Sequence, residues 1–204
     1  MGRKTRQFQI GAPYHVAHRG NHKQQLFESD DDRRFYLGLI ARSAKLTRMS
    51  IAGYCLMSNH VHFLVVPSRR WSISGCFGRA HRRYSEVLNH RRGMHGANWE
   101  GRFFAEMLDD RHAINVLRYI ERNPVAAGLV TQPWDWAWSS AAQHVGERCT
   151  RQLLDHRLNV MPPSPWTWRE MVETPLSTTE LETIAWETIV ESGAQMGSGT
   201  PQLL

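Results

Sequence analysis

The stretch SIAGYCLMSNHVHFLVVP, near the middle of the 204-residue chain, constrains the fold more than any other feature. It predicts two β-strands, near residues 51–57 and 60–66, joined by a tight turn at Ser58 and Asn59. The second strand is apolar on both faces, with Val61, Phe63 and Val65 on one and Leu64 and Val66 on the other. Because such a strand must be covered on both faces, we expect a sheet with other elements packed on each side.

The segments around this hairpin predict the order strand, helix, strand, strand, helix, strand, followed by a third helix. The predicted bounds are 13–19 for the first strand, Ser29 or Asp30 to Thr47 and about 72–90 for two helices, Arg102 onward for the last strand, and Asp109 or Asp110 to just before Pro124 for the third helix. This order is that of the ferredoxin-like α+β fold, βαββαβ, with the third helix after the fourth strand. In such a sheet the first and third strands lie together at the centre.

The chain predicts one α+β domain at residues 1–145 and a mostly helical C-terminal extension at 146–204. In the extension, a proline-rich link (MPPSPW) precedes a helix expected near 177–192, and the tail MGSGTPQLL is expected to be flexible. Three alternating tryptophans in the preceding PWDWAWSS segment are expected to pack as a cap against the domain.

The positive charge is concentrated in the first half of the chain. The net charge is +6, but residues 1–112 hold 19 lysines and arginines against 9 acidic residues, whereas residues 113–204 carry a net charge of −4. Seven arginines accompany the single acid Glu86 in one stretch: Arg69, Arg70, Arg79, Arg82, Arg83, Arg91 and Arg92. Arginine suits bidentate phosphate contact, so we expect these residues to bind a polyanion. The alternative is a basic solvated surface without a partner.

Composition narrows the class of protein and its compartment. With 41% hydrophobic residues the chain can bury a core without disulfides, and its three cysteines form no CxxC pair that would predict a zinc site. No apolar run approaches the roughly 18 residues that cross a bilayer, and the basic N-terminus lacks the apolar stretch of a signal peptide. We therefore expect a cytoplasmic protein without membrane association.

Two histidines open the most apolar strand. Strand side chains alternate, so His60 and His62 face one side and Val61 the other. Two imidazoles one pleat apart can hold one metal ion. Short HxH triplets also arise by chance, and two polar residues at a strand start explain the pattern equally well.

The third helix carries Tyr119 and Asn123 beside its apolar stripe. Four residues apart, they lie about 40° from each other on the helix and point toward the sheet at one edge. Tyr119 can supply a hydroxyl nucleophile, and Asn123 a neutral oxygen ligand for a hard cation. Taken alone, the pattern favours an interfacial tyrosine and an asparagine in the last helical turn.

Other residues compete for these roles. Tyr84, on the basic helix, is a second candidate nucleophile, but Asn89 follows it at the poorer offset of five residues; Tyr84 is otherwise expected to stack on a DNA base. His15 and His18 lie three apart on the first strand, so they face opposite sides, and at most one can join the site. Both are expected to contact DNA or the core.

Four motifs occur in order along the chain: NHVHFLV, NWEGRFFAE, RYIERNPVAAGLV and WAWSS. Together they resemble the REP-associated tyrosine transposases, of the single-tyrosine HUH transposase superfamily, over about residues 10–145. The resemblance implies a ferredoxin-like nuclease domain that cuts single-stranded DNA near hairpins. His60 and His62 would be the HUH pair, with Asn123 the third metal ligand and Tyr119 the nucleophile. Arg102, in the family's WxxRF pattern, would position the helix or contact DNA.

The resemblance also implies a mechanism, a cofactor and a partner. Mg²⁺ or Mn²⁺ would activate the scissile phosphate, and Tyr119 would form a covalent 5′-phosphotyrosine that can be rejoined. The partner would be single-stranded DNA with a hairpin, in the bacterial cytoplasm and associated with the nucleoid. The superfamily includes dimers that share sites as well as monomers, so a homodimer stays open.

Two alternatives keep part of this interpretation. The first is a non-catalytic hairpin-binding protein on the same fold, which would keep the basic surface without the nuclease. The second is a metal hydrolase that uses HxH with water as the nucleophile, but the sequence offers no HExxH motif or acidic cluster for it. A covalent protein–DNA adduct would separate the transposase from both.

Overall fold

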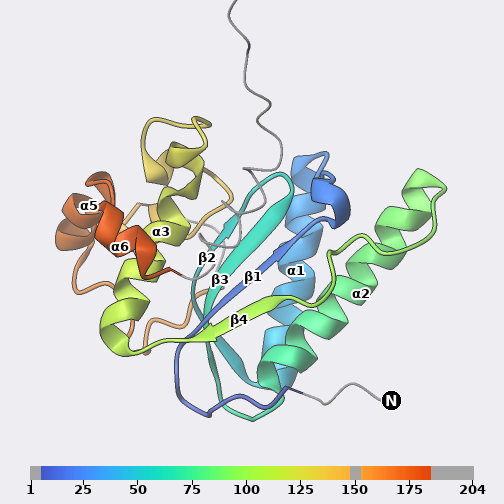
Figure 1. The fold of residues 1–204 in the computed structure, drawn as a ribbon, viewed down its shortest axis with the longest axis horizontal. Helices are drawn as coiled ribbons and strands as arrows, with labels where there is room; N and C mark the ends of the chain where they lie inside the picture. The colour runs from blue at the N-terminus through green and yellow to red at the C-terminus, as the bar shows by residue number, and fades with distance from the viewer. Residues whose placement is uncertain (1–5, 148–152, 185–204) are drawn as a thin grey trace, which may run out of the picture.

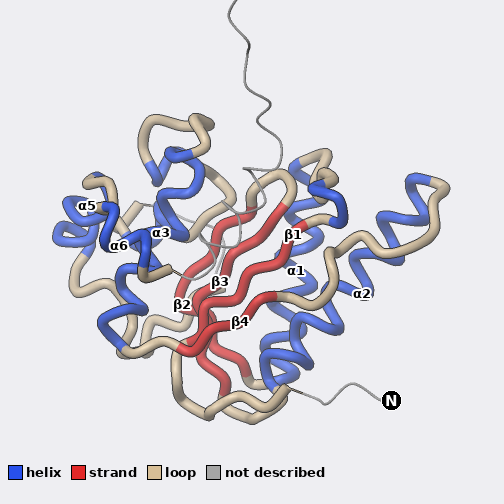
Figure 2. The backbone as a smooth tube through the Cα atoms, in the orientation of Figure 1, coloured by secondary structure: helices blue, strands red, loops and turns tan. Residues whose placement is uncertain are grey.

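A four-stranded antiparallel sheet forms the centre of the computed structural model, which describes residues 6–147 and 153–184. The strands lie in the order β2 (Met49–Leu56), β3 (His60–Pro67), β1 (Tyr14–Arg19) and β4 (Phe104–Met107). The ferredoxin-like prediction is confirmed, with β1 and β3 side by side in the middle of the sheet (Figure 2).

Helices α1 (Asp30–Thr47) and α2 (Ser72–Arg92) cover one face of the sheet (Figure 1). Ser29 starts α1 with a capping box, in which its side chain accepts from the Asp32 amide and the Asp32 carboxylate accepts from the Ser29 amide. A short 3-10 turn, η1 (Asn21–Lys23), links β1 to this region. The buried core of this face includes Phe63 of β3.

Helix α3 (Asp110–Ala126) covers the opposite face, so both faces of β3 are covered as the sequence predicts. The prediction that this helix ends before Pro124 is wrong. Proline lacks one backbone donor, so its place in the last turn costs the helix one hydrogen bond. The backbone around it is still bonded, because the Ala127 amide donates to Asn123 O and the Leu129 amide donates to Pro124 O.

Close packing of α3 against the sheet depends on a glycine in β2. Gly53 lies at a β-bulge, where the register of β2 against β3 shifts. A Cβ at this position would overlap the Leu117 side chain of α3 and approach Ser140 Oγ to 3.1 Å. The absence of a side chain therefore lets the Leu117 side chain of α3 pack directly on the backbone of β2.

In the described parts of the chain after α3, up to residue 184, there are four short helices: η2 (Pro133–Asp135), α4 (Ala141–His144), α5 (Pro165–Glu173) and α6 (Thr178–Glu182). The sequence predicts only a link where α5 begins, yet Pro165 occupies its first turn and Ser164 caps it. Of the helix expected near 177–192, the described part is α6, and the residues from 185 onward lie outside the described part. The tryptophan cap is confirmed in part, since Trp138 is buried and Trp136 Nε1 donates to Leu56 O.

A buried carboxylate on α3 joins the helix to the later segments. Glu121 is fully buried and accepts hydrogen bonds from Trp168 Nε1 of α5 at 2.8 Å, from His144 Nδ1 at 2.6 Å and from Ser140 Oγ. A buried carboxylate with three donors is stable where an unpaired one would not be. These bonds hold α5 and the WAWSS segment against α3.

Two arginines of α3 add to this attachment. Arg118 donates to Met171 O of α5 and pairs with Glu180 of α6 at 2.7 Å. Arg122 donates to Val172 O at 2.6 Å. Helix α3 is therefore held between the sheet and the C-terminal helices, which lie together on one side of the molecule (Figure 1).

Trp168→Ala should lower the free energy of unfolding by about 3–5 kcal/mol, because it opens a cavity and removes a donor from Glu121. Urea unfolding followed by circular dichroism measures this loss. Trp166→Ala on the same helix is the matched control, since Trp166 is 82% exposed and its removal should change stability by no more than about 0.5 kcal/mol. Equal losses in the two variants would show that α5 is not held through Trp168.

Candidate active site on the α3 face of the sheet

The two histidines of β3 face helix α3. Val61 and Phe63, between and beyond them, pack with α1 and α2, whereas Leu64 packs in the core beneath α3. Because side chains alternate along a strand, His60 and His62 share the face of Leu64. The predicted shared face is confirmed. His62 is fully buried, and His60 is half-buried at the start of the strand.

Tyr119 and Asn123 lie on α3 beside these histidines. The Tyr119 ring is 5.6 Å from the His62 ring between centroids and nearly perpendicular to it. The Asn123 side chain is hydrogen-bonded to His60, which raises the pKa of that imidazole against the larger effect of burial. The structure therefore brings together all four predicted residues, and their chemical roles stay predictions.

The turn before β3 supplies an acceptor for His60. The Asn59 amide nitrogen donates to Lys23 O at 3.3 Å, which turns its oxygen toward His60 Nδ1, 2.8 Å away. An amide oxygen only accepts, so this contact favours a proton on Nδ1. Ligating histidines are commonly oriented in this way through their other nitrogen.

His15 is the first-strand histidine that joins the site. Its Nε2 lies 3.1 Å from His62 Nδ1, and its ring is 6.2 Å from that of Tyr119. Burial lowers the pKa of His15 to about 3 and that of His60 to about 4, and it lowers the pKa of His62 well below its ordinary value. The imidazoles are therefore neutral at physiological pH, as metal ligands must be.

His18 faces the opposite side of the sheet, as the three-residue spacing predicts. Its Nδ1 lies 3.0 Å from His81 Nδ1, and Tyr36 Oη lies 2.9 Å from His81 Nε2. Trp99 stacks on both imidazoles. The prediction that His18 contacts DNA or the core is thus resolved in favour of the core.

Sequence reasoning missed Arg19 and Asn59. Arg19 lies opposite His60 in the β1–β3 register, and its charge lowers the pKa of that imidazole. Glu100 holds the guanidinium through two hydrogen bonds, which raise the pKa of Arg19. The pairing of β1 with β3 brings Arg19 and Glu100 to the site. Glu100 belongs to the NWEGRFFAE motif, but the motif alone does not show that it lies near His60.

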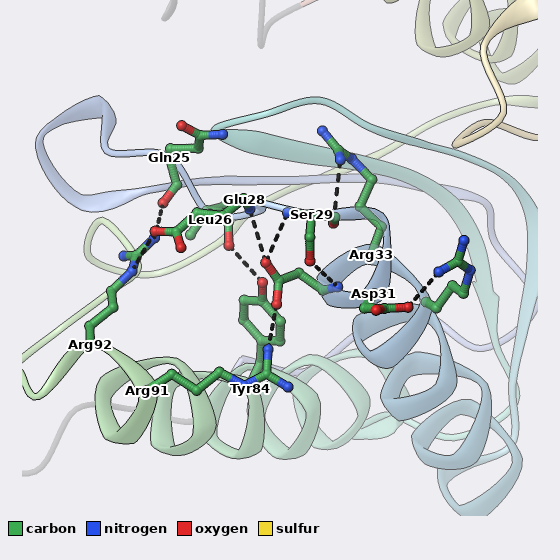
Figure 3. Close-up of polar contacts among 11 residues, drawn as sticks. Gln25, Leu26, Glu28, Ser29, Asp31, Arg33, Tyr84, Arg91 and Arg92 are labelled. Carbon is green, nitrogen blue, oxygen red and sulfur yellow. Dashed lines mark hydrogen bonds and ion pairs between the residues drawn. The ribbon is translucent and has the colours of Figure 1, made fainter.

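Tyr84 is buried, whereas the sequence predicts an exposed residue that can stack on a DNA base. The residue is 2% exposed, and its hydroxyl donates to Leu26 O at 2.6 Å, as Figure 3 shows. Burial raises the pKa of the phenol. The prediction that Tyr84 stacks on a base is wrong, because this side of α2 packs against α1, and the same burial removes Tyr84 as a rival nucleophile.

The predicted DNA-binding arginines fall into two groups. Arg91 pairs with Asp32 at 2.6 Å. Arg92 pairs with Glu28 at 2.6 Å (Figure 3), so the charge of both arginines is largely neutralised. Arg82 and Arg83 share one acid, Glu86, on the exposed surface of α2. The other predicted arginines have no ion pair among the described residues, and of these Arg69 is half-buried and the rest exposed: Arg69, Arg70, Arg79 and Arg102.

In the described ranges, 6–147 and 153–184, no three His, Cys, Asp or Glu side chains gather in a way that would hold a metal. A metal at this site would therefore need the Asn123 amide oxygen, and a further ligand from elsewhere, to add to His60 and His62. Within the same ranges, no helix has the length and apolarity to cross a membrane.

Known proteins share the family and the fold of this chain. The family model described as transposase IS200 like matches residues 9–123. The structure of a REP-associated tyrosine transposase bound to a REP hairpin has a TM-score of 0.56 and 19% identity, over 78% of this chain and 96% of that one. No curated protein sequence matches significantly.

Two further structures are less similar. A protein assigned as a transposase from Deinococcus radiodurans R1 gives a TM-score of 0.42 at 16% identity, over 59% of this chain and 97% of that one. A bacterial tRNA(His) guanylyltransferase-like protein in complex with ATP gives 0.43 at 15% identity, over 62% and 63% of the two chains. The family match, together with the fold, defines this protein as a transposase. The chain belongs to the IS200-like transposase family.

The buried histidines should make stability fall in acid. Below pH about 6.5 the unfolded chain takes up protons that folded His15 and His18, with pKa values of about 3 and 4, do not. The free energy of unfolding should therefore decrease between pH 6.5 and 4, by up to about 1.4 kcal/mol per pH unit for each histidine.

Urea unfolding at pH 7.5, 6.5 and 5.0 measures this dependence. His18→Asn should reduce the slope, whereas the exposed His22→Asn should leave it unchanged. Stability that stays flat from pH 6.5 to 5.0 would contradict the neutral state of these imidazoles.

Proposed function

We propose that this transposase is a metal-dependent single-strand DNA endonuclease that cleaves and rejoins DNA near hairpins through a covalent 5′-phosphotyrosine. The observation that carries the proposal is the packing of the Tyr119 ring against His62, with His60 and Asn123 on the same face. All four groups come from one chain. The activity would be exerted on DNA in the cytoplasm.

Tyr119 is suited to nucleophilic attack by its place on a fixed helix. Its oxygen would form a bond to the scissile phosphorus while the bond from phosphorus to the 3′-oxygen breaks, and the phenol proton leaves as the 3′-oxygen gains one. The phosphodiester energy is kept in the phosphotyrosine. A 3′-hydroxyl can then attack the phosphotyrosine and rejoin the strand without ATP.

The donor set fits Mg²⁺ or Mn²⁺. His60 and His62 offer neutral imidazole nitrogens, and Asn123 offers an amide oxygen, with no thiolate in the set. A cation held there would withdraw charge from the phosphoryl oxygens and so favour attack by the phenolate. With no carboxylate in the set, the protein alone should bind the ion weakly, and the DNA phosphate is expected to complete its coordination.

The basic surface supports a polyanionic substrate. Arg19 lies beside His60 and is paired with Glu100, and exposed arginines lie on α2, on the other face of the sheet. The structurally similar REP-associated tyrosine transposase is bound to a REP hairpin. We propose a hairpin with an adjoining single strand as the substrate of this chain too.

Tyr119→Phe should abolish covalent adduct formation with a labelled single-stranded hairpin DNA from the same genome in Mn²⁺, and leave hairpin binding within about twofold. The change removes one hydroxyl and should lower stability by no more than about 1 kcal/mol. Adduct is measured on a denaturing gel. Tyr84→Phe is the matched control, because it also removes one tyrosine hydroxyl but lies in the core, and it should keep the adduct.

Three results of this assay would contradict the proposal. Adduct formed by Tyr119→Phe would show that another residue is the nucleophile. Adduct formed in the presence of EDTA would show that cleavage does not need a divalent metal. A wild-type protein that binds hairpins but never forms adduct would be a hairpin-binding protein without nuclease activity.

The paired change Arg82→Ala and Arg83→Ala should weaken hairpin binding by about tenfold at low salt and flatten its dependence on salt, whatever the DNA sequence. The paired change Arg91→Ala and Arg92→Ala should have a smaller effect on binding, because each of these arginines is already neutralised by its own acid. Fluorescence anisotropy between 50 and 200 mM salt, roughly the range over which phosphate contacts are lost, separates the two pairs. Equal losses of affinity in the two variants would show that Arg82 and Arg83 do not form the DNA-binding surface.

A further inference from the structure

Two buried polar atoms beside the site lack a hydrogen-bond partner in the described part of the chain. They are His15 Nδ1 on β1 and Glu106 Oε2 on β4. The two residues stand directly opposite each other in the β1–β4 register, so their side chains share one face of the sheet. Directly opposed Cβ atoms lie about 4.5–5.5 Å apart, which lets the side chains meet directly or through one water molecule.

The other nitrogen of His15 is already engaged. His15 Nε2 lies 3.1 Å from His62 Nδ1, so one proton must lie between the two neutral rings. If His62 donates, its Nε2 carries the lone pair and His15 carries its proton on Nδ1. If His15 donates instead, both tautomers reverse and His62 Nε2 carries a proton that blocks metal binding.

An ionised Glu106 would decide between these two arrangements. An ionised carboxylate only accepts, so it favours a proton on the His15 nitrogen that faces it and disfavours a lone pair there. A proton on His15 Nδ1 leaves Nε2 as an acceptor, and His62 Nδ1 must then donate. The same order of donors holds if a water molecule connects the carboxylate to His15.

We infer that Glu106 and His15 are positioning residues that hold His62 in its Nδ1-protonated tautomer, with the Nε2 lone pair available to the divalent cation. The inference rests on the proposed function for the identity of that ligand. The arrangement resembles the one at His60, where the Asn59 oxygen lies 2.8 Å from Nδ1 and favours a proton on that nitrogen. Each histidine of the pair thus has its own acceptor, one from the turn before β3 and one from β1 and β4.

A merely structural role for Glu106 would change stability without changing the tautomer of His62. Two-bond ¹H–¹⁵N correlation spectra of the full, metal-free chain at pH 7.5 report the tautomer of each histidine directly. We expect His62 and His15 both protonated on Nδ1. Glu106→Leu should populate the reversed tautomers, whereas Glu106→Gln should keep the wild-type pattern because its amide oxygen still accepts.

The same variants are titrated with Mn²⁺ alone. Glu106→Leu should weaken Mn²⁺ binding by about 10- to 100-fold, the range seen when outer partners of ligating histidines are removed. Glu106→Gln should stay close to wild type. Met107→Leu is the matched control, because Met107 is the next residue on β4, points to the other face and is 53% exposed.

The wild-type spectrum is decisive even if Glu106→Leu fails to fold. A His62 ring protonated on Nε2, or tautomers that Glu106→Leu leaves unchanged, would overturn the inference. If the tautomers are as expected but the wild-type protein binds no Mn²⁺, the inference about His62 is supported and the metal dependence in the proposed function is contradicted.

Discussion

The burial of β3 on both faces is the constraint on which the rest of the structure depends. Its apolar side chains need α1 and α2 on one side and α3 on the other, so the strand that carries His60 and His62 lies under the helix that carries Tyr119. Polar groups on such a strand are tolerated only with partners. The histidines therefore sit at the end of the strand where α3, β1 and the preceding turn can supply those partners.

Much of this arrangement can be predicted from local patterns. The alternation in β3 and the stripe of α3 give the sheet, its two covered faces and the proximity of Tyr119 and Asn123 to the histidines. Tyr84 could not be placed, because the arginines around it suggest an exposed helix while packing against α1 buries that side. The roles of Arg19, Glu106 and His15 depend on strand register, which no local pattern contains.

Helix α5 in the C-terminal region also depends on contacts that its local sequence does not reveal. Its prolines suggested a link, yet Pro165 suits the first turn of a helix, and the apolar Trp168 and Val172 gave too short a pattern to predict α5. What fixes α5 is the buried Glu121 of α3, a partner 47 residues earlier in the chain than Trp168. The helix that bears Tyr119 is thus held from both sides, by the sheet and by α5.

Gly53 gives this arrangement an additional consequence. Because the Leu117 side chain of α3 packs on bare backbone there, a single layer of side chains separates the helix from β2. A side chain at position 53 would occupy the space of Leu117 and push the helix away from the sheet. A residue with no reactive group of its own thereby keeps Tyr119 close to the sheet face that carries the two histidines.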